Sequence, residues 1–298
     1  MTSLRSRILH ITLQRVTGAI ALDHSTQEQR TRLDELARRG IRLPRGVTVS
    51  TTRAGDVHAE WIEPSGTDTK RVILYLHGGG YCICSLDTHR GLAARLALAA
   101  QARVLSIAYR LAPENPFPDA LEDSLAAYRW LLGQGISPNQ IAIGGDSAGG
   151  GLTLATAVSL RNEGEPLPAA LFLLSPWTDL TFSGESVQAK RKVDPIFGHN
   201  GSPQYVSPYV GSYDPAYPLI SPLFADLHGL PPVLIHVGSD EILLDDSTRV
   251  HEKLRTAGVE SRLKVWEGMW HVFQVFAPYV PEAQRSIDII GEFVREHI

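Results

Sequence analysis

The chain has 298 residues, enough for one large α/β domain, or for such a domain with a smaller lid, around a sizeable core. Hydrophobic residues make up 43% and charged residues 20%, which is ordinary for a soluble globular protein, and the formal net charge of −4 argues against nucleic acid as a partner. The only two cysteines, Cys82 and Cys84, cannot form a disulfide framework, and no Cys/His cluster at ligand spacing indicates a metal site.

The N-terminal segment predicts two amphipathic helices. Residues 4–22 carry apolar side chains at helical spacing, and a second helix begins at the capping box formed by Ser25 and Glu28 and ends near Gly40. Polar residues interrupt the first apolar run, so it is neither a signal peptide nor a membrane span, and we expect a cytoplasmic protein. An interfacial membrane helix remains the alternative for residues 4–22. The apolar residues of the two helices are Ile8, Leu9, Leu13, Val16, Leu33 and Leu36.

The next segments alternate between strand and helix patterns. Two runs with a period of two flank Ala54-Gly55-Asp56 and predict an antiparallel hairpin. Short apolar runs then alternate with helical stretches, which predicts a mostly parallel sheet with helices on both faces. The expected parallel strands are Val72–Leu76, Val104–Ala108, Ile141–Ile143, Ala170–Leu174, Val233–Val237 and Leu263–Trp266, and the expected helices are 87–100, 119–133, 148–163, 243–257 and 281–297.

Residues 176–232 break this alternation. They are rich in proline and tyrosine, carry little strand signal, and are too long for a plain loop, so we interpret them as a lid or cap insertion. The expected organisation is therefore a catalytic core of residues 46–175 and 233–298, with residues 1–45 and 176–232 outside it. Because ligands of open α/β sheets bind at the carboxyl ends of the strands, functional residues are expected just after each strand.

A sharp turn at Ser147 is the strongest chemical signal. Gly145, Ser147 and Gly149 form the Gly-x-Ser-x-Gly pattern between an apolar strand and a helix, which is typical of a nucleophile elbow. The alternative is a glycine-rich strand–helix turn with a surface serine.

A second glycine-rich turn, His77-Gly78-Gly79-Gly80, directly follows the strand Val72–Leu76. Glycines expose backbone N–H groups, and a tetrahedral intermediate needs such donors at its oxyanion. We expect Gly79, Gly80 and Ala148 to donate these hydrogen bonds; the alternatives are a phosphate-binding loop or a flexible turn.

A serine nucleophile needs a histidine base and a carboxylate that orients it, in the chain order serine, acid, histidine. His271 follows the last strand and is the expected base, whereas the other downstream histidines, among them His199 and His228 in the insertion and His236 in a strand, are less well placed. The candidate carboxylates are Asp240, Glu241, Asp245 and Asp246. Asp240 is the expected acid because it follows the strand Val233–Val237 closely, and Asp245 and Asp246 are interpreted as solvated helix charges.

Together these motifs resemble the bacterial esterases of the hormone-sensitive lipase family. The resemblance runs from about Val47 to the C-terminus and includes Tyr109 to Glu114 and Ser175 to Leu180. It implies an α/β-hydrolase fold with a helical cap built from the N-terminal segment and the insertion, hydrolysis of short-chain carboxylic esters and no cofactor. One departure is in Asp240-Glu241-Ile242, where many relatives have proline after the aspartate. The motifs that carry the resemblance are His77-Gly78-Gly79-Gly80, Gly145-Asp146-Ser147-Ala148-Gly149-Gly150, Asp240 and His271.

The expected function is therefore a serine carboxylesterase acting on a small-molecule ester through an acyl-enzyme, with Ser147, His271 and Asp240 as its triad. A lactone hydrolase or an amidase would share this chemistry. A small-molecule receptor on the same fold is the alternative from another class, and an ester assay separates it from an enzyme. The natural substrate and a homodimer are left open.

Overall fold

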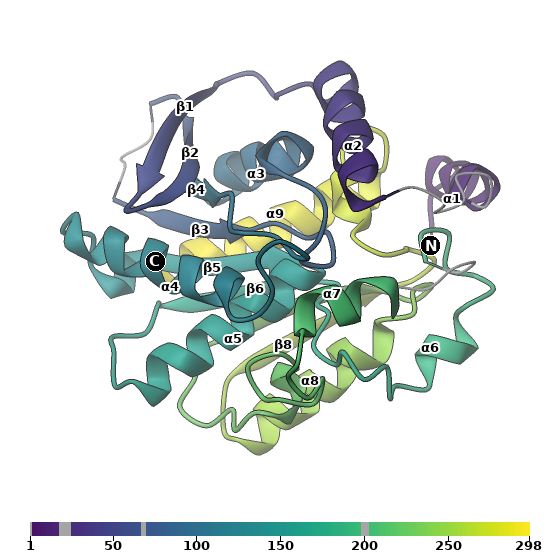
Figure 1. The fold of residues 1–298 in the computed structure, drawn as a ribbon. Coiled ribbons are helices and arrows are strands. Elements are labelled where there is room, and N and C mark those ends of the chain that lie inside the picture. Colours follow the sequence, from purple (N-terminus) through teal and green to yellow (C-terminus); the bar gives the residue numbers. More distant parts are fainter. Residues whose placement is uncertain (1, 18–24, 67–69, 198–202) are drawn as a thin grey trace.

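The computed structural model describes residues 2–17, 25–66, 70–197 and 203–298, and Figure 1 shows their arrangement around one twisted sheet. The eight strands of this sheet lie in the order β1-β2-β4-β3-β5-β6-β7-β8. Strands β1, β2 and β4 pair antiparallel, and all pairs from β4 to β8 are parallel, so the predicted hairpin and the mostly parallel sheet are confirmed. The strands are β1 (Val47–Ala54), β2 (Val57–Pro64), β3 (Val72–Leu76), β4 (Arg103–Ile107), β5 (Ile141–Asp146), β6 (Ala170–Leu174), β7 (Val233–Gly238) and β8 (Ser261–Trp266).

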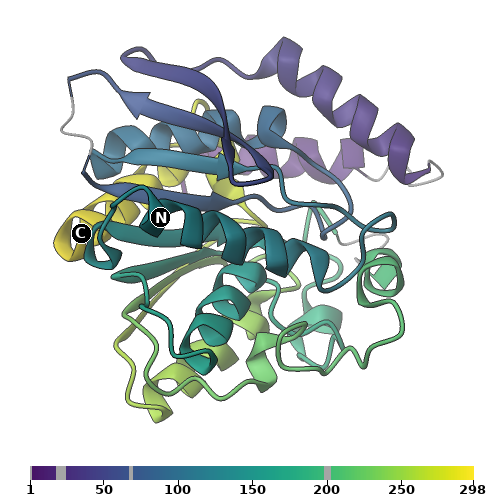
Figure 2. The same ribbon diagram turned by 60° about the vertical axis from the view of Figure 1, so that its left-hand side comes forward.

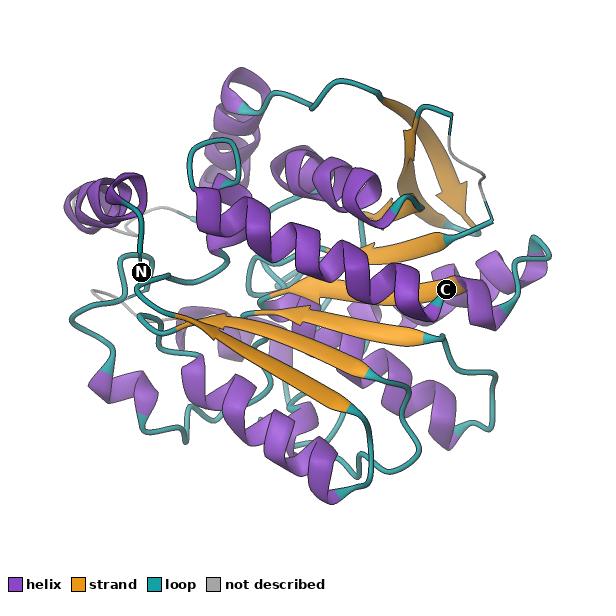
Figure 3. Cartoon of the chain, turned by 180° about the vertical axis from the view of Figure 1, so that it is seen from behind, coloured by secondary structure: helices purple, strands orange, loops and turns teal. Residues whose placement is uncertain are grey.

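Helices cover both faces of the sheet, as Figures 1 and 3 show from opposite sides. One apolar cluster packs α3 and α9 against one face, and a second packs α4, α5 and α8 against the other. Strands β3 and β6 are therefore buried at every position, as expected of central parallel strands. The helices are α1 (Leu4–Thr17), α2 (Thr26–Gly40), α3 (Leu86–Ala100), α4 (Asp119–Gly133), α5 (Ala148–Asn162), α6 (Ser186–Ala189), α7 (Val206–Val210), α8 (Leu244–Thr256) and α9 (Pro281–His297).

The insertion between β6 and β7 carries the short helices α6 and α7 and, among its described residues, no strand. It is fastened to the core by the first turn of α8: Asp245 accepts a hydrogen bond from the amide of Ser186, and Asp246 accepts two from Thr178 and Asp179. Asp246 is 1% exposed, so its interpretation as a solvated helix charge is wrong. Burial raises the pKa of its carboxyl to about 8.

The N-terminal helices lie outside the layers of the core. Helix α1 is expected to extend to residue 22, and residues 18–22 and the side chain of Val16 lie outside the part that is described. Helix α2 begins at the predicted capping box of Ser25 and Glu28. In Figure 3 the arrowheads of the parallel strands point to the side of the molecule where α1 lies. No helix of the described chain is both long and apolar enough to cross a bilayer.

Candidate active site

The turn at Ser147 has the strained geometry of a nucleophile elbow. Ser147 lies between β5 and α5 with φ 54° and ψ −121°, a region that side chains other than glycine rarely adopt. The turn is packed so tightly that a Cβ on Gly145 or Gly149 would lie within 2.4 Å of the carbonyl oxygen of Leu76. Glycine is therefore required on both sides of Ser147, which is the physical reason for the Gly-x-Ser-x-Gly spacing.

The His77–Gly80 turn lies beside this elbow with exposed backbone donors. Gly79 and Gly80 have φ of 113° and 60°, and a Cβ on Gly80 would lie 2.7 Å from the ring of Tyr205. Within the described chain, the N–H groups of Gly79, Gly80 and Ala148 donate to no other protein atom. These three predicted donors are thus available to a ligand, whereas the amide of Gly78 is bound to Asp146.

A buried carboxylate supports this turn from below. One oxygen of Asp146 accepts hydrogen bonds from the Tyr75 hydroxyl at 2.6 Å and from the Gly78 amide at 3.1 Å. The other oxygen lies 3.1 Å from Nε2 of His89 on α3. Burial alone would raise the pKa of Asp146, but His89 and Tyr75 outweigh it and hold that pKa below its usual value. Burial alone would lower the pKa of His89, but the Asp146 carboxylate raises it.

His77, the histidine of this turn, is packed against Tyr109. Its ring stacks on Tyr109 at 4.4 Å between centroids, and the Tyr109 hydroxyl donates to the carbonyl of His77 at 2.6 Å. Burial lowers the pKa of His77 to about 4, so its ring is neutral near pH 7. This contact places Tyr109 under the turn and away from any reacting atom, as a support.

The expected base, His271, is bound to a carboxylate at the ends of β7 and β8. Its Nδ1 lies 2.8 Å from an oxygen of Glu241, and both side chains are buried. The other oxygen of Glu241 accepts hydrogen bonds from the Ser175 hydroxyl at 2.7 Å and from the Gly238 amide at 2.6 Å. Glu241 is therefore held by three donors that fix its side chain against the ring.

Asp240, the expected acid, does not contact His271, and that prediction is corrected. Its side chain is 27% exposed; one oxygen accepts a hydrogen bond from the Ser239 hydroxyl at 3.0 Å, and the other lies 3.8 Å from Nδ1 of His10 on α1. The backbone turns between the two residues, so that Asp240 points toward α1 while the longer side chain of Glu241 folds back under the strand ends. The prediction chose Asp240 because it lies close to the end of β7. That criterion was wrong, because it took no account of the different directions in which the two side chains point.

Ser147 and His271 are connected through the corner that follows β6. The amide of Ser147 donates to the carbonyl of Leu174 at 2.8 Å, and the hydroxyl of Ser175 accepts from the amide of Val272 at 3.1 Å. The same hydroxyl donates to Glu241. The corner thus joins the nucleophile turn, the acid and the histidine loop.

Comparison with known proteins identifies the family to which this chain belongs. A family model described as the alpha/beta hydrolase fold matches residues 73–275. The crystal structure of an esterase from the bacterial hormone-sensitive lipase family is 44% identical, covers 100% of both chains and superposes with a TM-score of 0.95. The chain belongs to the hormone-sensitive lipase family of α/β hydrolases. This confirms the family resemblance and the expected fold.

Relatives of this hydrolase with named activities span most of its length. An acetyl-hydrolase from Streptomyces hygroscopicus is 42% identical over 81% of this chain and 80% of its own. An esterase from Acinetobacter venetianus is 40% identical over 88% of this chain and 86% of its own. A crystal of EstE5 soaked with p-nitrophenyl butyrate gives a structure that is 40% identical, covers 99% of both chains and has a TM-score of 0.94.

In this hydrolase the insertion contacts His271 through Phe197, and Asp194 holds Phe197 in place. Asp194 is 2% exposed and accepts hydrogen bonds from the amides of Ile196 and Phe197 at 2.8 and 3.0 Å, and from the amide of Ile242 at 2.9 Å. The ring of Phe197 then meets His271 edge to face at 4.6 Å. Asp194 thereby joins the insertion to the residue that follows Glu241. Burial raises the pKa of Asp194 in spite of these donors.

Helix α2 of the hydrolase reaches the other side of the site. Arg30 donates to the carbonyls of Cys82 and Ala112 at 2.8 and 2.6 Å and forms an ion pair with Glu114. The neighbouring Gln29 accepts a hydrogen bond at 2.8 Å from the hydroxyl of Tyr205, whose ring covers Gly80. Figure 2 shows α2 and α7 at the same end of the sheet.

Among the described residues, metal-dependent and thiol-dependent catalysis and the other candidate bases have little support. Among the described residues, no group of three His, Cys, Asp or Glu side chains could hold a metal ion. Burial raises the pKa of Cys82 and Cys84 to about 12, so neither thiol is a nucleophile near pH 7. His199, one of the histidines considered as a base, lies outside the described residues, and His236 is buried within β7.

Proposed function

We propose that this hydrolase is a serine carboxylesterase that cleaves esters of short acyl chains through an acyl-enzyme. The observation that carries the proposal is the strained Ser147 turn, joined through the corner after β6 to the loop of a histidine whose Nδ1 is bound to a buried carboxylate. The names of the relatives, an acetyl-hydrolase and an esterase, support the reaction class. The EstE5 crystal soaked with a butyrate ester supports the choice of substrate for the first assay.

In the proposed reaction the Ser147 hydroxyl attacks the carbonyl carbon of the ester while Nε2 of His271 takes its proton. Glu241 binds the Nδ1–H, fixes the tautomer and stabilises the imidazolium that forms. The N–H groups of Gly79, Gly80 and Ala148 bind the oxyanion. The imidazolium then protonates the leaving alcohol, and water, activated by the same base, releases the acid from Ser147.

The first experiment replaces the nucleophile. We expect Ser147→Ala to lower kcat for p-nitrophenyl butyrate on the order of a millionfold. Intact-mass analysis after treatment with an organophosphate is expected to show one adduct on the wild type and none on Ser147→Ala. The control is Ser50→Ala, on an exposed position of β1, which keeps full activity and the adduct. An adduct on Ser147→Ala would contradict the assignment.

We further propose that residues 1–45 and 176–232 form a cap that limits acyl-chain length. The contacts of Tyr205 with Gln29 and Gly80, and of Phe197 with His271, support this role. Enclosure by such a cap removes water from the oxyanion donors and strengthens their hydrogen bonds.

The cap is tested at Tyr205. Tyr205→Ala is expected to raise the ratio of octanoate to butyrate hydrolysis severalfold, because it opens the space above Gly80. Tyr213→Ala, a half-exposed tyrosine of the same insertion, is the matched control and is expected to leave the ratio unchanged. An unchanged ratio in Tyr205→Ala would remove the proposed role of this residue in chain-length selection.

A further inference from the structure

The outer face of α1 exposes a stripe of large apolar side chains. Leu4, Ile8 and Ile11 follow one another at spacings of four and three residues, so they share one side of the helix. Their side chains are 73%, 56% and 50% exposed. Helix α1 projects from the body of the molecule in Figures 1 and 3, which leaves this side of the helix uncovered.

Cations border the stripe on both sides. Arg5 and Arg7 lie on opposite flanks of it, Arg15 continues it by one turn, and all three are exposed. The helix, with the sequence LRSRILHITLQRVT, has no acidic residue. This is the pattern of a helix that lies in an interface, with an apolar centre and arginines at its edges.

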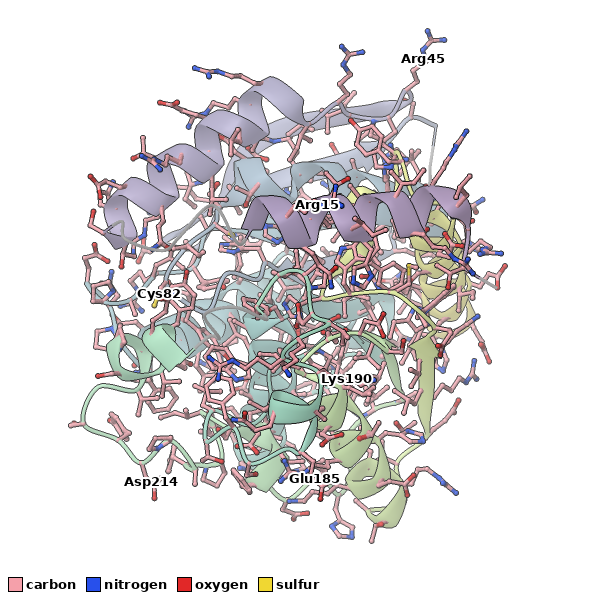
Figure 4. The ribbon with its side chains drawn as sticks, turned by 90° about the vertical axis from the view of Figure 1, so that its right-hand side faces the viewer. Arg15, Arg45, Cys82, Glu185, Lys190 and Asp214 are labelled. Carbon is pink, nitrogen blue, oxygen red and sulfur yellow. The ribbon has the colours of Figure 1, made fainter. Side chains whose placement is uncertain are left out.

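A second basic segment adjoins α1. Nε2 of His10 and the side-chain amide of Gln14 both bind the carbonyl of Val193, at 3.0 and 3.1 Å, and Val193 itself is 39% exposed. The three residues before it are Lys190, Arg191 and Lys192. Figure 4, which faces this side of the molecule, shows α1 with Arg15 and, below it, Lys190.

We name the α1 face as Leu4, Arg5, Arg7, Ile8, Ile11 and Arg15 together with residues 190–193. Its six cations form no ion pair with any carboxylate among the described residues. They are concentrated here in a chain whose formal net charge is −4, so the face differs in sign from the molecule as a whole.

We propose that the α1 face docks on an anionic lipid surface. Six cations would attract such a surface, and three exposed apolar side chains would enter the boundary between headgroups and acyl chains. Apolar residues at the centre of the face favour lipid over a nucleic acid, which would need polar or stacking contacts there.

Docking of this face would bring the lipid surface close to the site. His10 lies on the flank of α1 next to residues 190–193; its ring lies 5.6 Å from that of Trp270, and its Nδ1 lies 3.8 Å from the carboxylate of Asp240. These two residues directly precede His271 and Glu241 in the chain. The proposal concerns binding alone and does not depend on the esterase activity.

The experiment measures sedimentation of the full chain with vesicles, without substrate. We expect the wild type to bind vesicles of equimolar phosphatidylglycerol and phosphatidylcholine, and to bind phosphatidylcholine vesicles at least tenfold more weakly. The combined variant Arg5→Gln, Arg7→Gln and Arg15→Gln is expected to lose roughly a hundredfold in affinity, at about 1 kcal/mol per cation. Ile8→Ser with Ile11→Ser is expected to lose at least tenfold.

Matched controls carry the same chemical changes elsewhere on the surface. Arg39→Gln, Arg45→Gln and Arg255→Gln remove three other exposed arginines, and Leu36→Ser with Leu43→Ser removes two other exposed leucines. Both controls are expected to bind within twofold of the wild type.

Four results would overturn the proposal. Three come from the vesicles: no binding of the wild type to the anionic vesicles, equal binding to phosphatidylcholine alone, or equal losses in the α1 variants and in their controls. Size-exclusion chromatography without vesicles gives the fourth: a dimer that dissociates in Ile8→Ser with Ile11→Ser would show that a second copy of the chain covers this face. Circular dichroism spectra verify that each variant is folded.

Discussion

The two sides of the site are held together by different means. On the oxyanion side, Ser147 and the His77–Gly80 turn follow the adjacent strands β5 and β3 and rest on the single buried carboxylate of Asp146. On the acid side, His271 and Glu241 follow β8 and β7 and are joined by Ser175 from β6 and by the insertion. The first side consists of contiguous motifs, whereas the second is assembled from four separate segments.

This difference shows which part of the site a short sequence motif can predict and which part it cannot. A motif such as Gly-x-Ser-x-Gly carries its own geometry, because each glycine is required by a local close approach. The partner of His271 depends on which way two consecutive side chains point after β7, and only long-range contacts decide that. Apart from Ser147 itself, substitutions on the acid side are therefore expected to affect catalysis most, and those beneath the oxyanion turn to affect stability.

After the nucleophile, the largest effect is expected at Glu241. Glu241→Gln should lower kcat for p-nitrophenyl butyrate roughly ten-thousandfold, because an amide favours the wrong tautomer of the catalytic histidine. Asp240→Asn is the matched control, one residue away, and should retain activity within about tenfold. Steady-state kinetics on both variants decide between the two carboxylates, and a reversed order would restore Asp240 as the acid.

A smaller effect is expected at Asp194, which joins the insertion to the acid side. Asp194→Asn should lower the free energy of unfolding by about 1–3 kcal/mol, because the amide cannot accept from all three N–H donors. It should also lower kcat about tenfold with little change in KM, since Phe197 loses its fixed position against His271. Asp226→Asn, an exposed aspartate of the same insertion, is the control. Equal denaturation curves and kinetics in the two variants would contradict this role.

The smallest effect is expected beneath the oxyanion turn, and it depends on pH. The pKa of His89 is raised above its ordinary value of 6.5 in the folded protein, so its interaction with Asp146 contributes fully below that value and is lost as the pH rises through the folded-state pKa. His89→Gln should therefore cost about 1–2 kcal/mol at pH 5.5 and less at pH 9. Urea denaturation at both pH values measures this, with the exposed His228→Gln as control. A cost that grows with pH would show that His89 is neutral in the folded protein.

The sequence predicted the helices and strands of the core far better than the long-range contacts that assemble the site. The helices and strands of the core were found because buried strands and amphipathic helices leave distinct periods in the chain. Ser147 and the oxyanion glycines were identified from motifs whose spacing has a local steric cause.

Ser175 and Asp194 were missed as members of the site. Ser175 appeared only as part of a family landmark, and its φ of 46° and its bond to Glu241 leave no mark in the sequence. Asp194 lies in the insertion, where no periodicity indicated which polar residue is buried. Glu241 was among the candidate carboxylates, but Asp240 was preferred because it is one residue closer to the end of β7.

The central claim, that Glu241 binds the base, is tested most directly by observing the proton between them. In proton NMR of uniformly ¹⁵N-labelled protein, the Nδ1–H of His271 should give a low-field resonance in the wild type and in Asp240→Asn. The same resonance should be absent or shifted strongly upfield in Glu241→Gln. Its loss in Asp240→Asn, together with its retention in Glu241→Gln, would contradict the account.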